Sequence, residues 1–166
     1  MVVHPKKQKH CLPGELEVGD CWIWLSQAKD IGLILSARVG KHTNKLTEEL
    51  VTSTEGKTDC QEWDTDGWGG YERVLPPEVE HHVGKDRTQR LERTNGILRQ
   101  QTGRWHRQQN KFGKEWEQTK VTTRLMVSYF NWMWSHSRLG NTAAQRAGLA
   151  SDPWCWHTFA TFPTLL

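Results

Sequence analysis

The sequence predicts an α/β fold, in which a mixed β-sheet is flanked by helices, and three observations lead to this prediction. The chain has 166 residues, about the size of one ordinary domain and enough to bury a core. Short runs of β-prone apolar residues come first, and longer segments with helical spacing follow. The predicted order is strand, strand, helix, strand, helix, helix, which is typical of layered folds.

The amino-terminal part supplies two predicted strands. Residues 1–20 mix Pro, Gly and charged residues after two valines, so we expect the end of a strand followed by a polar loop. The runs 21–27 (CWIWLSQ) and 32–39 (GLILSARV) are rich in apolar β-prone residues, and a polar turn at 28–30 separates them. They predict an antiparallel hairpin.

A helix and a third strand are predicted next. Leu46, Leu50 and Val51 share one face of a helix over residues 42–53, which should pack on the sheet. Residues 62–66 (EWDTD) predict a short strand that ends at a glycine-rich turn, and two prolines break regular structure after it.

The carboxyl-terminal half is predicted to be helical. Residues 87–108 favour a helix, although Gly96 and Gly103 each cost about 1 kcal/mol relative to Ala there. Residues 115–134 are rich in large apolar side chains and predict a long core helix. The sequence after Leu139 shows no helical or strand periodicity, and no apolar run approaches the ~20 residues of a membrane helix.

Basic residues are concentrated in one segment of a nearly neutral chain. The formal charge of +3 by itself does not indicate a nucleic-acid partner. Residues 81–120, however, contain ten basic and four acidic residues, a net charge of +6, which leaves −3 for the rest. The four cysteines are widely spaced and form no CxxC pair, which is typical of free thiols in a cytoplasmic protein.

Two short strings contain candidate acidic groups. Asp66 ends the third predicted strand, so its carboxylate should project from the carboxyl edge of the sheet, where sites of α/β folds are usually assembled. Asp-Gly is also a common turn dipeptide, so Asp66 could simply cap the turn. Glu92 stands among arginines on a predicted helix, as a metal ligand beside DNA or as an ordinary ion-pair partner.

Together these strings resemble the carboxyl-terminal catalytic region of insertion-sequence-1-type transposases, and the similarity extends over about residues 20–150. Its motifs are TDGWGGY (65–71), His81-His82, Gly84-Lys85, TQRLERTN (88–95), Leu98-Arg99, RWHR (104–107) and NTAAQRAG (141–148).

The resemblance implies a ribonuclease-H-like fold and a DDE active site, in which three acids hold Mg²⁺ (or Mn²⁺) in a two-metal site. Asp66 stands in the place of the second acid and Glu92 in the place of the third, with 25 residues between them. The implied function is that of a bacterial insertion-sequence transposase, which cleaves DNA and transfers strands in transposition. The implied partners are element-end and target DNA, and either further copies of the chain or an upstream transposase protein.

The first acid of the triad is expected to lie before Met1. Residues 1–20 would then be a remnant of the first strand with a polar loop, 21–138 the ribonuclease-H-like catalytic domain, and 139–166 a carboxyl-terminal extension. Such a chain would need an upstream piece for activity. The alternatives are a non-catalytic DNA-binding remnant that inhibits the intact transposase, and a host ribonuclease-H-like nuclease.

Two aspartates could substitute for the first acid. Asp20 precedes the second strand of the family and Asp30 lies in the hairpin turn, and a loop or turn role is the more usual one for both.

The basic segment supplies the predicted DNA contacts, and about half of its side chains should contact phosphates, since a helix cannot point them all one way. Trp68, Tyr71 and Trp105 could stack on a splayed base, or Trp105 could pack in the core beside Leu98. The two histidines at 81–82 are predicted as surface residues of a proline-rich loop. The predicted DNA-binding residues are Lys85, Arg87, Arg90, Arg93, Arg99, Arg104 and Arg107.

Overall fold

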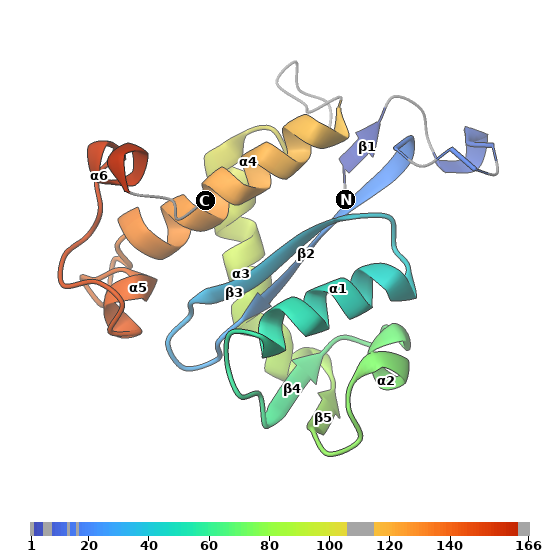
Figure 1. Cartoon of the computed structure of the whole chain (residues 1–166), viewed down its shortest axis with the longest axis horizontal. Helices are drawn as coiled ribbons and strands as arrows, with labels where there is room; N and C mark the ends of the chain where they lie inside the picture. Colours follow the sequence, from blue (N-terminus) through green and yellow to red (C-terminus); the bar gives the residue numbers. More distant parts are fainter. Residues whose placement is uncertain (1, 5–7, 13, 16, 106–114, 163–166) are drawn as a thin grey trace.

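The computed structural model describes residues 2–4, 8–12, 14–15, 17–105 and 115–162, and it shows helices packed around two small β-sheets (Figure 1). The predicted α/β class is confirmed. Among the described residues, however, two separate sheets take the place of the single mixed sheet that the sequence predicts. No helix in these parts of the chain is long and apolar enough to cross a membrane.

The first sheet contains the predicted hairpin. Strands β1 (Val2–His4), β2 (Gly19–Gln27) and β3 (Ile34–Gly40) are antiparallel, in the order β1-β2-β3. The turn between β2 and β3 is closed by the Ala28 amide, which donates to the Leu33 carbonyl at 2.8 Å. Both the hairpin and a strand near the start of the chain are therefore confirmed.

Helices cover both faces of this sheet. Neighbouring residues of a strand point to opposite sides, and β2 has apolar side chains on both. Trp24 packs against Leu50 of helix α1 (Asn44–Glu55). Leu25 faces the other way and packs with Leu98 of a later helix. The three apolar residues that were predicted to face the sheet from α1 are all buried.

The second sheet joins β4 (Glu62–Thr65) and β5 (Glu80–Val83), which run parallel and are connected through the short helix α2 (Gly70–Val74). The sequence predicts β4 but neither α2 nor β5. The prediction that the histidines at 81–82 lie in a loop is wrong, since both are on β5. The string EHHV has no apolar alternation, and its strand conformation follows from pairing with β4 rather than from intrinsic propensity.

Helix α3 (Lys85–Thr102) follows β5 directly and ends at Gly103. The φ of Gly103 is +59°, in the left-handed region that glycine adopts readily and that commonly ends helices. The helix predicted over 87–108 is therefore confirmed for most of its length but stops earlier, and residues 106–108 lie outside the described part of the chain.

The long core helix predicted over 115–134 is present as α4 (Trp116–Ser128), which continues into a π-helical turn, η2 (Tyr129–Met133). Asn131 in this turn is buried, and its side-chain amide forms two hydrogen bonds of 2.9 Å with the backbone of Ile34. These bonds tie η2 to the start of β3. The other elements are η1 (Gln8–His10), α5 (Ala143–Arg146) and α6 (Trp156–Thr161).

Candidate active site

A cavity of about 430 Å³ is bounded by both sheets and by helix α3. Its lining comes from β2 with the following turn (25–30), from β4 with its flanking residues (58–66), and from one side of α3 between residues 87 and 95. Asp66 and Glu92 both line it. The two acids that the sequence singles out are thus brought to one cavity from different elements.

Asp66 lies immediately after β4, at the start of the glycine-rich turn. Its side chain is exposed, and Oδ1 accepts a hydrogen bond of 3.2 Å from the amide of Trp68. Asp66 therefore caps this turn, as the simpler interpretation predicted, and it lines the cavity as well. The turn is anchored by Trp68, whose ring centroid lies 3.9 Å from that of His42 and whose indole N–H donates to Thr47 Oγ1 at 3.4 Å.

Glu92 is exposed on α3. The intrahelical ion pair expected under the alternative interpretation is not observed. In the parts of the chain that the structure describes, neither Glu92 nor Asp66 forms an ion pair.

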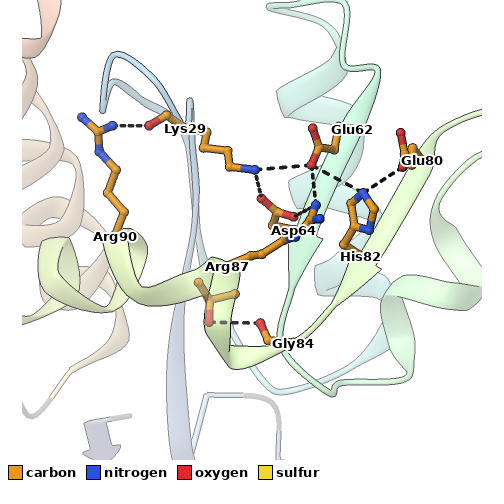
Figure 2. A network of polar contacts seen from close by, with 9 residues as sticks. Lys29, Glu62, Asp64, Glu80, His82, Gly84, Arg87 and Arg90 are labelled. Atoms are coloured by element: carbon orange, nitrogen blue, oxygen red, sulfur yellow. Dashed lines mark hydrogen bonds and ion pairs between the residues drawn. The ribbon is translucent and has the colours of Figure 1, made fainter.

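Two further acids of β4 have a different environment. Lys29 Nζ lies 2.8 Å from Asp64 Oδ2 and 3.3 Å from Glu62 Oε1, and Arg87 Nη1 lies 2.9 Å from the same oxygen of Glu62 (Figure 2). Burial of Asp64 opposes its charged form, but Lys29 and Arg87 outweigh this effect and hold the pKa of Asp64 below its usual value. The hydrogen bond to Asp64 in turn raises the pKa of Lys29.

Sequence reasoning missed this network, although one signal was present. Glu62 and Asp64 alternate along β4, so they share one face of it. The cationic partners of these two acids are more than twenty residues away in the sequence, and no local pattern indicates them.

The two histidines of β5 have different partners. His81 Nε2 lies 2.7 Å from Thr65 Oγ1, and this hydroxyl also donates to the Asp66 carbonyl at 3.1 Å. His82 Nε2 lies 2.9 Å from Glu80 and extends the ionic network of β4. Both are half-buried, so neither is a simple surface residue.

The structure separates the predicted DNA-binding residues into two groups. Arg87 is part of the ionic network, and Arg90 donates to the carbonyls of Lys29 and Asp30, the latter at 3.0 Å. These two arginines therefore hold protein elements together. The exposed members without an ion pair in the described part of the chain are Lys85, Arg93, Arg99 and Arg104, and Arg107 lies outside it.

The three aromatic residues proposed for base stacking all pack against the protein. Trp68 contacts His42, and Tyr71 lies between Trp24 and Trp63, with ring centroids 5.7 and 6.4 Å away. Burial raises the pKa of Tyr71 above its usual value. Trp105 packs in the core cluster that contains Leu98, as its alternative interpretation predicted.

The two aspartates considered as substitutes for the first acid lie in different places. Asp30 lines the cavity from the hairpin turn, whereas Asp20 lies where β2 pairs with β1 and is absent from the lining. Among the described residues, no three His, Cys, Asp or Glu side chains are grouped so that they could hold a metal ion.

The two predicted acids nevertheless fit a divalent ion by their chemistry. Mg²⁺ prefers oxygen ligands and is often held by one or two carboxylates together with waters and phosphates. Asp66 and Glu92 supply two such carboxylates at the rim of one cavity. The described site thus offers two of the three expected acids.

Comparison with known proteins identifies the family of this chain. No curated protein matches the sequence. The family model described as IS1 transposase matches residues 16–132, a stretch that begins just before β2, ends within η2 and contains both Asp66 and Glu92. Because the match covers well over half of the chain, this protein belongs to the IS1 transposase family.

Proposed function

We propose that this chain is the catalytic region of a DNA transposase that performs metal-dependent cleavage and strand transfer during transposition of a bacterial insertion sequence. One observation carries the proposal beyond family membership. Asp66 and Glu92 line one cavity and form no ion pair in the described part of the chain, whereas Asp64 and Glu62 beside them are neutralised by cations. Of these four acids, Asp66 and Glu92 are therefore the two without a cationic partner in the described part of the chain.

In this proposal Asp66 and Glu92 hold Mg²⁺ or Mn²⁺. When bound, such an ion stabilises negative charge on the reacting phosphate. The hydrogen bond from the Trp68 amide orients Asp66, and α3 orients Glu92. The exposed Lys85 and Arg93 of the same helix are placed to contact DNA phosphates, which fix the position of the DNA without reading its sequence.

The ribonuclease-H-like arrangement is part of the proposal. β2 pairs with β1 only over Gly19–Cys21 and then lines the cavity with residues 25–27, while β4 lines it from the other sheet. A further strand between β2 and β4 would join the two sheets into one mixed sheet, and an upstream transposase protein would supply both this strand and the first acid of the triad. Residues 21–138 would form the catalytic domain and 139–166 an extension.

The test uses DNA that carries the element ends, with the chain alone or together with the upstream transposase product, in the presence of Mg²⁺. We expect nicking and strand transfer only with both proteins. Asp66→Asn or Glu92→Gln should lower the rate at least about 100-fold, because loss of a metal ligand removes several kcal/mol of charge stabilisation. Glu117→Gln, an exposed glutamate of α4, is the matched control and should retain the rate. Equal rates for wild type and both site variants would rule out the assignment.

A non-catalytic DNA-binding protein is the second candidate, and the presence of two rather than three grouped acids among the described residues favours it. This candidate predicts that the chain binds DNA and lowers the activity of intact transposase, with no cleavage after addition of the upstream protein. Both candidates predict that affinity for DNA falls with salt, by a slope of about −0.9 per neutralised phosphate. Cleavage separates them.

A further inference from the structure

We propose that Lys29 and Arg87 are positioning residues, which fix helix α3 against strand β4 so that Glu92 and Asp66 can bind one metal ion. This inference rests on the proposed function and deepens it. It assigns a role to the ionic network drawn in Figure 2, which contains neither of the two proposed ligands among its labelled residues.

The network balances charge around a nearly buried acid. The Asp64 side chain is only 12% exposed, and it lies 2.8 Å from Lys29 Nζ and 3.5 Å from Arg87 Nη1. The same two cations reach Glu62 at 3.3 and 2.9 Å. Two acids therefore meet two bases. Both oxygens of the poorly hydrated Asp64 carboxylate lie within ion-pair distance of a cation, but the buried Oδ1 accepts no hydrogen bond from the described residues.

The network also links three separate elements. Lys29 belongs to the turn between β2 and β3, and its side chain binds β4 through Asp64. Its backbone carbonyl accepts a hydrogen bond from Arg90, one turn along α3 from Arg87. Arg87 links α3 to β4 directly through its ion pairs with Glu62 and Asp64. Movement of α3 relative to β4 would break at least one charged contact.

The residues that make these contacts lie close in the sequence to both proposed ligands. Asp64 precedes Asp66 by two residues, Asp66 directly follows the last residue of β4, and both line the cavity. Arg87 precedes Glu92 by five residues, about 7.5 Å along the helix axis. Loss of contacts that orient metal ligands typically weakens metal binding by about 10- to 100-fold.

The direction of the change in metal affinity distinguishes a positioning role from an effect of charge alone. Removal of a positive charge near the cavity should strengthen binding of a divalent cation if the charge acts only through space. Removal of a positioning residue should weaken it. Lys29 and Arg87 are thus informative targets, whereas replacement of Asp64 would weaken binding under either explanation.

The experiment is a Mn²⁺ titration of the full chain, followed by electron paramagnetic resonance. We expect Lys29→Met and Arg87→Met each to weaken Mn²⁺ binding about tenfold. Lys45→Met is the matched control, because Lys45 is an exposed cation of α1 and lies outside the network. It should leave binding unchanged or slightly tighter. Lys29→Arg, which keeps the charge, should retain most of the affinity.

A second measurement, without metal, reads the position of α3 directly. Amide hydrogen exchange over residues 91–95 should become about tenfold faster in Lys29→Met and Arg87→Met but not in Lys45→Met, with unchanged circular dichroism. Unchanged exchange, or Mn²⁺ binding equal to or tighter than that of wild type in both variants, overturns the positioning role. If Asp66→Asn binds Mn²⁺ as tightly as wild type, the proposed metal site fails instead, and the exchange rates still decide whether the network holds α3.

Discussion

The two sheets of this protein are held in place by different forces. The β2–β3 hairpin is packed on both faces by apolar side chains, such as Trp24 and Leu25. The β4–β5 pair depends much more on polar contacts, among them those of Thr65 with His81 and of Asp64 with Lys29. Apolar burial therefore stabilises the hairpin, whereas the polar sheet leads directly into Asp66, one of the two acids of the candidate site.

The largest expected effect lies on the apolar side of this comparison. Leu50 is fully buried between α1 and the hairpin, so Leu50→Ala should lower the free energy of unfolding by about 2–5 kcal/mol. Urea denaturation measures this loss, and Leu139→Ala, at an exposed leucine, should change stability by less than about 0.5 kcal/mol. Similar losses in the two variants would contradict the assignment of the core.

A pH effect is expected next, from a thiol on the apolar side. Burial raises the pKa of Cys21 from the ordinary 9.0 to about 12. The folded chain therefore keeps a proton that the unfolded chain releases, so stability should fall as pH rises from 9.0 toward about 12. Unfolding free energies across this range should decline less steeply for Cys21→Ala. An identical slope in the variant would show that other groups cause the decline.

A smaller effect is expected in the polar sheet. Thr65→Val keeps the shape of the side chain but removes the hydroxyl that contacts His81 and donates to the Asp66 carbonyl, at a cost of about 1 kcal/mol. The urea midpoint should shift without a change in slope. Thr52→Val, at an exposed position of α1, is the control. A shift no larger than that of the control would show that the hydroxyl contributes no stability.

The smallest effect concerns salt. At about 1 M NaCl the screening length is about 3 Å, so the partly exposed ion pairs of β4 should weaken by a few tenths of a kcal/mol. Amide exchange should accelerate in β4 and β5, and the rates in β2 and β3 should stay constant. Equal acceleration of exchange in both sheets would contradict the proposal that the β4–β5 sheet depends more on polar contacts than the hairpin does.

The elements that the sequence predicts are those with a local signal of their own, such as a run of apolar β-prone residues or apolar residues at helical spacing. The hairpin, α1, β4, α3 and the core helix α4 are predicted in this way, and the structure contains all of them. Strand β5 was missed because its conformation depends on pairing with β4 rather than on its own residues. Gly103 was counted as a penalty inside a helix, yet its left-handed conformation ends α3. The same residue type can therefore weaken or terminate a helix, and its distance from the helix end decides which.

The candidate site was predicted only as far as local motifs reach. Asp66 and Glu92 stand in recognisable strings, and both line the cavity. The partners of Asp64 were not predictable, because Lys29 lies in the hairpin and Arg87 on α3, and only the folded chain brings them together. Arg87 and Arg90 were predicted as DNA contacts because their partners are distant in the sequence. In the structure both contact other parts of the protein.

Because of its packing, Trp68 is a natural fluorescent probe of the turn at Asp66. Its amide is held by Asp66, while its indole meets the rings of His42 and Trp24 at centroid distances of 3.9 and 6.4 Å. Indole emission is sensitive to neighbouring charge and to imidazole contacts. The spectrum of wild type minus that of Trp68→Phe therefore isolates one fluorophore among ten tryptophans. A change in the charge or the contacts of the Asp66 carboxylate should therefore change the fluorescence of Trp68.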